Sequence, residues 1–228
     1  MATSAASALT HVRERLDELD AAQWSDATIY RWMNEAAKNI ARQTHIYMDT
    51  DTINVVADTS EYTLPEDVLR VRHVYYSPTG DSNRAIPLEA RDWGAMDSVW
   101  GDRQNDNSSN YPACYTIIGY SPNATLKLWP VPSNGGSLVV HSARLPAEID
   151  PATGGGNVDI PTGWEDIIYE YVEYSALRKD RDARWQEAKT LYEEKLGSLM
   201  EMGEILNAPN EFTPSHLGGM VPSWLSDY

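Results

Sequence analysis

Cysteine, phenylalanine and positive charge are scarce in this chain of 228 residues, and each shortage excludes something. Cys114 is the single cysteine, so an intrachain disulfide and a zinc site built from cysteines are excluded. No run approaches the ~20 apolar residues of a membrane span, and the N-terminal stretch becomes charged at Arg13 before any apolar run of signal-peptide length. We therefore expect a soluble protein with no membrane partner, made in a reducing compartment.

The shortage of positive charge leaves the chain strongly acidic. It has 18 Lys and Arg against 34 Asp and Glu, a formal net charge of −16. Such a surface repels a phosphate backbone, which excludes tight wrapping of nucleic acid. The same sign suits a wall that DNA slides past without sticking, and it equally suits plain solubility.

The aromatic residues are almost all of two kinds, with eight Trp and thirteen Tyr against one Phe. Trp and Tyr combine a large contact area with a polar group, which is typical of half-wet surfaces and interfaces. A core that happens to use Tyr is the alternative, and composition leaves both open.

Two helices are predicted near the N-terminus. The first covers about Ala5–Leu19, where the residues of one face recur at helical spacing: Leu9, Val12, Leu16 and Leu19. The second follows Ser25, a good N-cap, and Asp26 favours the positive end of that helix. Its buried stripe repeats every three or four residues: Ile29, Trp32, Met33, Ala36, Ala37 and Ile40.

The middle of the chain changes to the period of strands. Short strands are predicted at Thr52–Ala57, at EYTL and at VLRVRHVYY, followed by a loop at Ser77–Arg84 and a short helix at about Glu89–Val99. The polar stretch Gly101–Pro112 is predicted to be a mobile surface loop. Three further strands, CYTIIGY, TLKLWPVP and SLVVHSAR, favour an antiparallel meander, with Pro130 and Pro132 placing the second strand or its end at an edge.

Two more helices are predicted in the last third, after a flexible hinge at Ala152–Asn157. Thr162 and Glu165 form the pattern of a capping box. The buried stripe of the first helix is Trp164, Ile167, Ile168, Tyr171, Val172 and Ser175. The second helix, at about Asp182–Leu206, repeats Ala188, Leu191, Tyr192, Leu196, Leu199 and Met202.

The stretch Asn207–Tyr228 is predicted to be an extended docking arm. Pro209, Pro214, Pro222 and the Gly218-Gly219 pair forbid a continuous helix. The arm is nevertheless too apolar for a solvated tail, so we expect it to bind a partner, or else to fold back over its own subunit. The residues that we expect to dock are Phe212, Leu217, Met220, Val221, Trp224, Leu225 and Tyr228.

The element order predicts an α+β fold, in which helices from both chain ends form a bundle around an inserted small antiparallel β domain. The expected units are the N-terminal helices (1–50), the β region (51–160), the C-terminal helices (161–206) and the arm (207–228).

Motifs for catalysis, metals and cofactors are missing. The five histidines have no metal spacing, and the phosphate-loop, nucleophile-elbow and dinucleotide signatures are absent. Asp49 and Asp51 begin like a calcium loop, but Val55 stands where its glycine belongs. Cys114 fits a buried structural residue at the start of a strand better than a nucleophile. We expect no cofactor and no catalytic residue, although a glycosidase-type pair of carboxylates stays open.

Three stretches resemble a known family. Trp24–Ala36 (WSDATIYRWMNEA) resembles the opening helix of phage head-to-tail adaptor proteins, the connector or tail tubular protein A-like family. Glu61–Tyr76 resembles the strand, Leu-Pro turn and strand that recur in that group. LKLWPVP followed by SLVVHSARLPAEI resembles its later β-hairpin. The similarity runs in order over about residues 20–203.

The resemblance implies a structural virion protein at the neck between capsid and tail, made in the host cytoplasm. Its members form a homo-oligomeric ring, typically a dodecamer, that binds the portal protein and a tail or nozzle protein. Double-stranded DNA passes through the ring without specific binding, and there is no catalytic residue to carry over. The alternatives are a virion-associated cell-wall hydrolase that uses paired carboxylates, and another neck or tail-completion protein.

Overall fold

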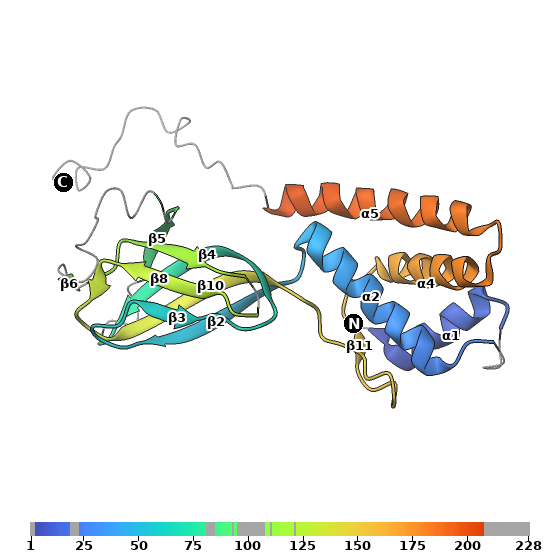
Figure 1. The fold of residues 1–228 in the computed structure, drawn as a ribbon, viewed down its shortest axis with the longest axis horizontal. Helices are drawn as coiled ribbons and strands as arrows, with labels where there is room; N and C mark the ends of the chain where they lie inside the picture. The colour runs from blue at the N-terminus through green and yellow to red at the C-terminus, as the bar shows by residue number, and fades with distance from the viewer. Residues whose placement is uncertain are drawn as a thin grey trace.

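The computed structural model describes residues 3–18, 23–80, 85–92, 94, 108–109, 111–120 and 122–207. The molecule is elongated and consists of a helical part and a β part that meet at a narrow waist (Figure 1). The predicted mixed α+β class is confirmed. The helical part contains α1 (Ala5–Arg15), α2 (Asp26–Thr44), α4 (Glu165–Asp180) and α5 (Trp185–Asn207).

The local signals at the N-terminal helices are confirmed. Ser25 is the N-cap of α2, and its hydroxyl accepts a hydrogen bond from the Thr28 amide at 3.3 Å. At the other end His45 adopts a left-handed conformation, with φ of 49°, and closes α2. The first helix ends earlier than predicted, at Arg15, and Leu19 lies outside the described residues.

The predicted capping box of α4 is wrong. The N-cap is Trp164, whose side chain makes no capping hydrogen bond. The Glu165 carboxylate accepts instead from the amide of Gly163 at 2.7 Å and from the Thr3 hydroxyl at 3.2 Å. The helix therefore begins two residues later than the pattern indicates, and Glu165 bonds to β1 and to the preceding turn.

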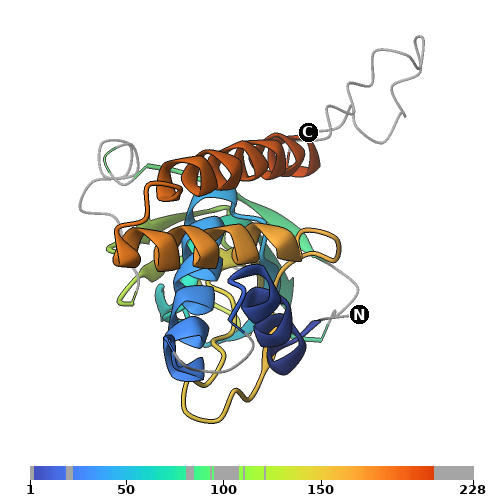
Figure 2. The same cartoon turned by 90° about the vertical axis from the view of Figure 1, so that its right-hand side faces the viewer.

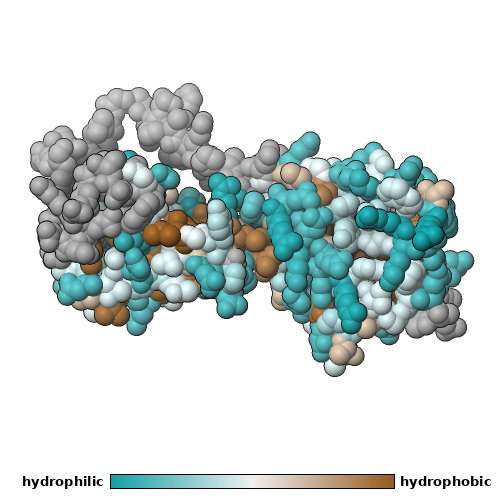
Figure 3. Space-filling view, viewed as in Figure 1, coloured by the Kyte–Doolittle hydropathy of each residue, from teal (hydrophilic) through white to brown (hydrophobic). Residues whose placement is uncertain are grey.

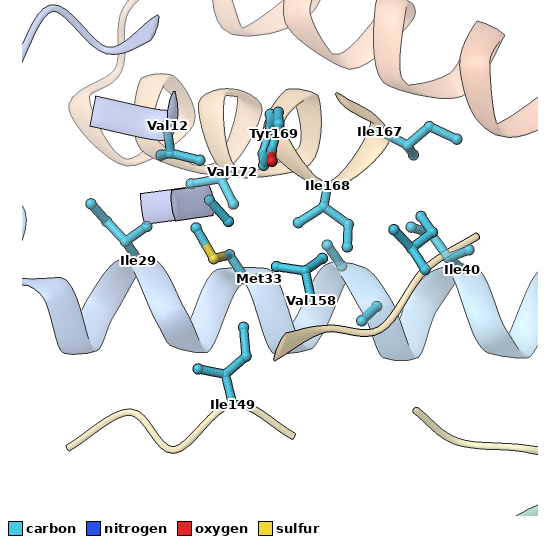
Figure 4. Packing of buried hydrophobic residues seen from close by; sticks show 14 of the residues in the cluster. Val12, Ile29, Met33, Ile40, Ile149, Val158, Ile167, Ile168, Tyr169 and Val172 are labelled. Atoms are coloured by element: carbon cyan, nitrogen blue, oxygen red, sulfur yellow. The ribbon is translucent and has the colours of Figure 1, made fainter. Parts of the chain in front are cut away.

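The predicted stripes largely form one core in the helical part. Figure 2 shows α5 and α4 stacked above α1 and α2, and Figure 4 shows the side chains between them. Leu191 is an exception, because it is exposed on α5. The largest fully buried members of this core are Val12, Ile29, Met33, Ile40, Ile167, Ile168 and Leu199.

The β part is built on one seven-stranded sheet with the order β2-β10-β4-β5-β7-β8-β3. The strands are β2 (Met48–Val55), β3 (Glu61–Thr63), β4 (Val68–Pro78), β5 (Ile86–Ala90), β7 (Cys114–Ile118), β8 (Thr125–Trp129) and β10 (Gly136–Arg144). The sheet curls until it is nearly barrel-like, and it encloses a second core whose fully buried members include Val74, Tyr76, Leu126, Leu128, Leu138 and Val140. Two short pairs complete the strands: β1 (Thr3–Ser4) with β11 (Asn157–Val158), and β6 (Ser108–Ser109) with β9 (Val131–Pro132).

The predicted antiparallel meander is only half right. β7 and β8 do pair antiparallel, but β10 does not follow β8. The edge of β8 that does not face β7 pairs with β3. β10 lies between β2 and β4, which are long strands like β10 itself. β8 is consequently no edge strand, although β3 covers only its first half, Thr125–Lys127. In addition, β5 and β7 run parallel, which no local pattern indicated.

Two predictions for the middle of the chain need correction. Glu89 and Ala90 end strand β5, so the predicted helix does not begin there. Gly94 is helical, while Trp93 and residues 95–99 lie outside the described residues. Of the predicted mobile loop, residues 101–107 and 110 are likewise outside. Its remaining residues are structured, because Ser108–Ser109 form β6 and Tyr111 packs against the sheet core.

The glycine-rich stretch at 152–157 is a hydrogen-bonded turn that rests on α2. The Gly154 amide donates to the Asp150 carbonyl at 2.8 Å, and the Asp150 amide donates to the Gly155 carbonyl at 2.9 Å. Gly154 has a φ of +65°, and a Cβ there would meet the Tyr30 hydroxyl at 2.5 Å. The turn is therefore part of the helical part and does not act as a free linker.

Candidate partner-binding surfaces

Polar contacts fix the chain at both ends of the segment 145–148, where it passes from the sheet to the helical part. In the helical part, the amide of buried Asn34 on α2 donates to the Ile149 carbonyl at 2.8 Å and accepts from the Ile149 amide at 2.9 Å. In the β part, the Arg144 guanidinium contacts the carboxylates of Asp49, Asp51 and Asp67. The two aspartates that begin like a calcium loop thus neutralise an arginine.

Charged residues also link three of the helices. Glu170 on α4 is only 4% exposed, and its carboxylate contacts Arg15 of α1 at 2.7 Å and Lys195 of α5 at 2.8 Å. Lys195 also reaches Asp166 at 2.6 Å. Burial by itself raises the pKa of Glu170, but hydrogen bonds from Lys195 and Arg15 outweigh it and hold that pKa below its ordinary value.

This network gives no support to a glycosidase-type site. The general acid of such a pair needs a raised pKa, whereas the pKa of Glu170 is lowered and Asp166 shares the same lysine. Within the described part of the chain, no group of three or more His, Cys, Asp or Glu could hold a metal ion. Cys114 is buried at the start of β7, as predicted, and burial raises the pKa of its thiol.

One open groove lies in the helical part, between α2, α4 and α5. It has a volume of about 630 Å³, and aromatic rings, cations and the carboxylates of Glu35 and Glu193 line it. Tyr171 stacks edge-on against Tyr192 at 5.2 Å, and Lys179 lies over the Trp32 ring at 5.4 Å. Burial raises the pKa of Tyr192 to about 12, so its hydroxyl stays neutral and accepts a hydrogen bond from Asn39. We call this the aromatic groove; its other lining cations are Arg178 and Lys189.

A second hollow, of about 430 Å³, opens in the β part between β4 and β7. Apolar side chains and polar groups both form its walls, and Arg70, Arg91 and Asp92 line it. Beside it, Ile117 and Ile118 are 37% and 38% exposed and Tyr120 is 90% exposed. We call this hollow the β4–β7 slot. Figure 3 shows that hydrophobic residues on the visible face gather over the β part and at the waist, while the helical part is mostly hydrophilic.

The site residues predicted from the sequence all lie in the arm, beyond Asn207, and so outside the described residues. Sequence reasoning missed both hollows. The aromatic groove had a partial signal, since its Trp and Tyr residues are those whose abundance suggested an interface. The β4–β7 slot had none, because it depends on a pairing between strands far apart in the chain.

Residues 3–212 match the family described as SU10 adaptor protein. The chain belongs to this adaptor family. A comparison with the curated proteins gives no match. Membership of the adaptor family indicates a phage structural protein of the virion that is non-enzymatic and contacts other phage proteins. No helix among the described residues of this adaptor is long and apolar enough to cross a membrane.

Proposed function

We propose that the chain is the repeating subunit of a head-to-tail adaptor ring, which joins the portal to the tail and extends the DNA exit channel. The observation that carries this proposal is the match to the adaptor family over nearly the whole chain. Two hollows with apolar or aromatic walls, on a chain with no motif for chemistry, support a role in contacts between proteins.

The ring is formed by contacts between copies of this chain, and its expected number is twelve, as the resemblance implies. The aromatic groove suits such a contact, because Trp and Tyr side chains are enriched at interfaces and its cations can meet the acidic surface of a neighbouring copy. A closed ring uses one such head-to-tail contact per subunit.

The arm, Asn207–Tyr228, grips the portal. Its apolar residues are the anchors, and burying one large aromatic side chain contributes about 1.5 to 3 kcal/mol. The same contact recurs in every subunit of the ring, which multiplies its effect. The anchors are Phe212, Leu217, Met220, Val221, Trp224, Leu225 and Tyr228.

The proposal is tested by electron microscopy of the full chain, alone and mixed with its assembled portal. We expect a ring that caps the portal, formed at the latest when the portal is present. Deleting Asn207–Tyr228 should leave a folded subunit that no longer attaches, and the full-length variant Trp224→Ser with Tyr228→Ser should weaken attachment. A chain that light scattering finds monomeric beside assembled portal would contradict the adaptor function.

A further inference from the structure

The β4–β7 slot lies where strand β5 would continue if it were longer. β5 pairs with β4 only at Val74–Tyr76, and with β7 only at Cys114 and Tyr115. Beyond Asp92, the N-terminal half of β4 and the end of β7 therefore face each other with no described strand between them. Strands on either side of a third stand roughly 10 Å apart, so the slot is about one strand wide.

Beyond Tyr115, the backbone on both sides of this slot has no partner among the described residues. The Tyr115 carbonyl lies on the edge of β7 that faces the slot. It accepts a hydrogen bond from the Arg91 amide at 2.8 Å, which is the last bond between β7 and the segment that continues β5. Since every second residue of a strand points the same way, the N–H and C=O of Ile117 face the slot as well. No described residue bonds to them there, whereas the other edge of β7 is paired with β8 through Ile118. On β4, Val68–Val71 pair only with β10.

Two apolar side chains of β7 beside the slot are also left partly exposed. Ile117 and Ile118 point to opposite faces of the sheet, yet both are more than a third exposed. Apolar walls come from Leu64, Leu69 and Val71. Arg70 at the rim is exposed and forms no ion pair with any residue that the structure describes. A segment that fits must be extended, with an apolar side chain for the wall and an acidic side chain for Arg70.

The chain itself carries such a segment in the arm. Residues 208–228 include Glu211 and Asp227 but no Lys or Arg, and SWLSDY (Ser223–Tyr228) is free of proline and glycine. The arm leaves α5 at Asn207, and Figure 1 shows that α5 ends at the waist, beside the β part. The fifteen residues 208–222 can span about 50 Å when extended. This is more than the length of β4, which at 11 residues is about 36 Å.

We propose that the β4–β7 slot is a strand-acceptor site, and that in the free subunit it is filled by Ser223–Tyr228 of the same chain. The segment adds beside Ile117 by backbone hydrogen bonds, with Leu225 against the apolar wall and Asp227 beside Arg70. Because the same arm is proposed to grip the portal, portal binding must first withdraw it from the slot. Only this second step rests on the proposed function.

The test is a disulfide cross-link in the full-length chain with Cys114→Ser as background. Ile117→Cys is combined with Leu225→Cys, and the matched control combines Thr52→Cys, exposed on β2 at an edge of the sheet, with Leu225→Cys. On mild oxidation at micromolar concentration, we expect an intrachain disulfide at Ile117→Cys and none in the control. Cross-links between chains only, or equal cross-linking in both variants, would overturn the proposal.

A second measurement does not depend on introduced cysteines. In amide exchange of the unmodified full chain, the segments that contain Ile117 and Ser223–Tyr228 should exchange at least about tenfold more slowly than in the full-length variant Leu225→Asp. Equal exchange rates in the two proteins would contradict the proposal that Ser223–Tyr228 fills the slot. Both tests use the protein without portal, so their outcome does not depend on ring formation. A failed test would leave the adaptor ring possible, and a chain that forms no ring could still pass both tests.

Discussion

At the scale of single residues, the most informative side chain is Glu170. The periodicity of α4 marks its apolar stripe, and Glu170 falls outside that stripe. The structure nevertheless buries it, because cations from α1 and α5 converge on its carboxylate. A buried charge is tolerated only when it is paired and hydrogen-bonded, so Glu170 ties three helices together.

Replacing Glu170 by Gln should destabilise the chain in a pH-dependent way. The folded pKa of Glu170 lies below the ordinary 4.5, so its stabilisation is present above that pH and is lost as the pH falls through the folded pKa. We expect a loss of about 1 to 3 kcal/mol at pH 7, since Lys195 and Arg15 remain partly solvated. Urea unfolding at pH 7 and below pH 4 measures the difference, which should shrink at the lower pH.

The matched control is Glu194→Gln, which removes an exposed carboxylate from α5. Its free energy of unfolding should stay within about 0.5 kcal/mol of that of the parent. If Glu170→Gln behaved like this control at both pH values, the network would contribute nothing to the packing of the helices.

Replacing Asn34 should destabilise the chain for a different reason. Asn34→Ala leaves the amide and carbonyl of Ile149 buried without a partner, which costs about 1 to 3 kcal/mol for each group. Asn39→Ala, which loses one bond to the Tyr192 hydroxyl at a half-buried site, should cost less. Urea unfolding at neutral pH ranks the two variants. A larger loss for Asn39→Ala would contradict the importance of the two hydrogen bonds between Asn34 and Ile149.

At the scale of elements, the 152–157 turn shows how a loop can belong to a core. Its glycine content predicted a hinge, but the backbone of the turn lies against α2 at Tyr30. A residue with any side chain would have to displace that ring. The same turn leads into β11, which pairs with β1 beside the start of α1.

Gly154→Ala and Gly163→Ala separate backbone strain from contact. Both glycines have positive φ, at +65° and +95°, but a Cβ at Gly163 would meet nothing within 4 Å. Gly163→Ala should cost about 1 to 2 kcal/mol for the left-handed backbone alone. Gly154→Ala should cost clearly more, because Tyr30 must move. Thermal unfolding of the two variants tests this, and equal losses would mean that Tyr30 yields freely.

At the scale of the whole molecule, charge and shape point to a part that touches proteins more than nucleic acid. The net charge of −16 belongs to an elongated chain that carries the aromatic groove and the β4–β7 slot. In the proposed ring, a surplus of Asp and Glu on the inner wall would let DNA pass without binding.

We therefore expect weak binding to double-stranded DNA. A gel shift at low salt with the full chain should give no complex at micromolar protein, because neutralising phosphates needs clustered Lys and Arg. Tight binding that falls steeply with added salt would contradict an acidic channel. The assembled ring, once obtained, should behave in the same way as the free chain.

Much of the fold was open to prediction from local signals. Ser25 caps α2 because its hydroxyl accepts a hydrogen bond from an amide three residues on, and the apolar spacing of α2 predicts which face is buried. In α4, burial extends beyond the predicted stripe to Tyr169 and Glu170. The three quoted stretches resembled phage adaptors, and the family match agrees with them at that level. The finer proposals, the ring, the portal and the arm, stay predictions.

The sequence by itself determined the helices, most of the strands, the absence of chemical motifs and the kinship with adaptors, since each is written in neighbouring residues. Only the tertiary structure decided where β10 lies, that β5 and β7 run parallel, and that Glu170 is buried. These features depend on contacts between residues tens of positions apart, where competing pairings differ by packing and chain length and leave no periodic trace. The β4–β7 slot belongs to this second group, because a strand that ends early is visible only once its neighbours are known.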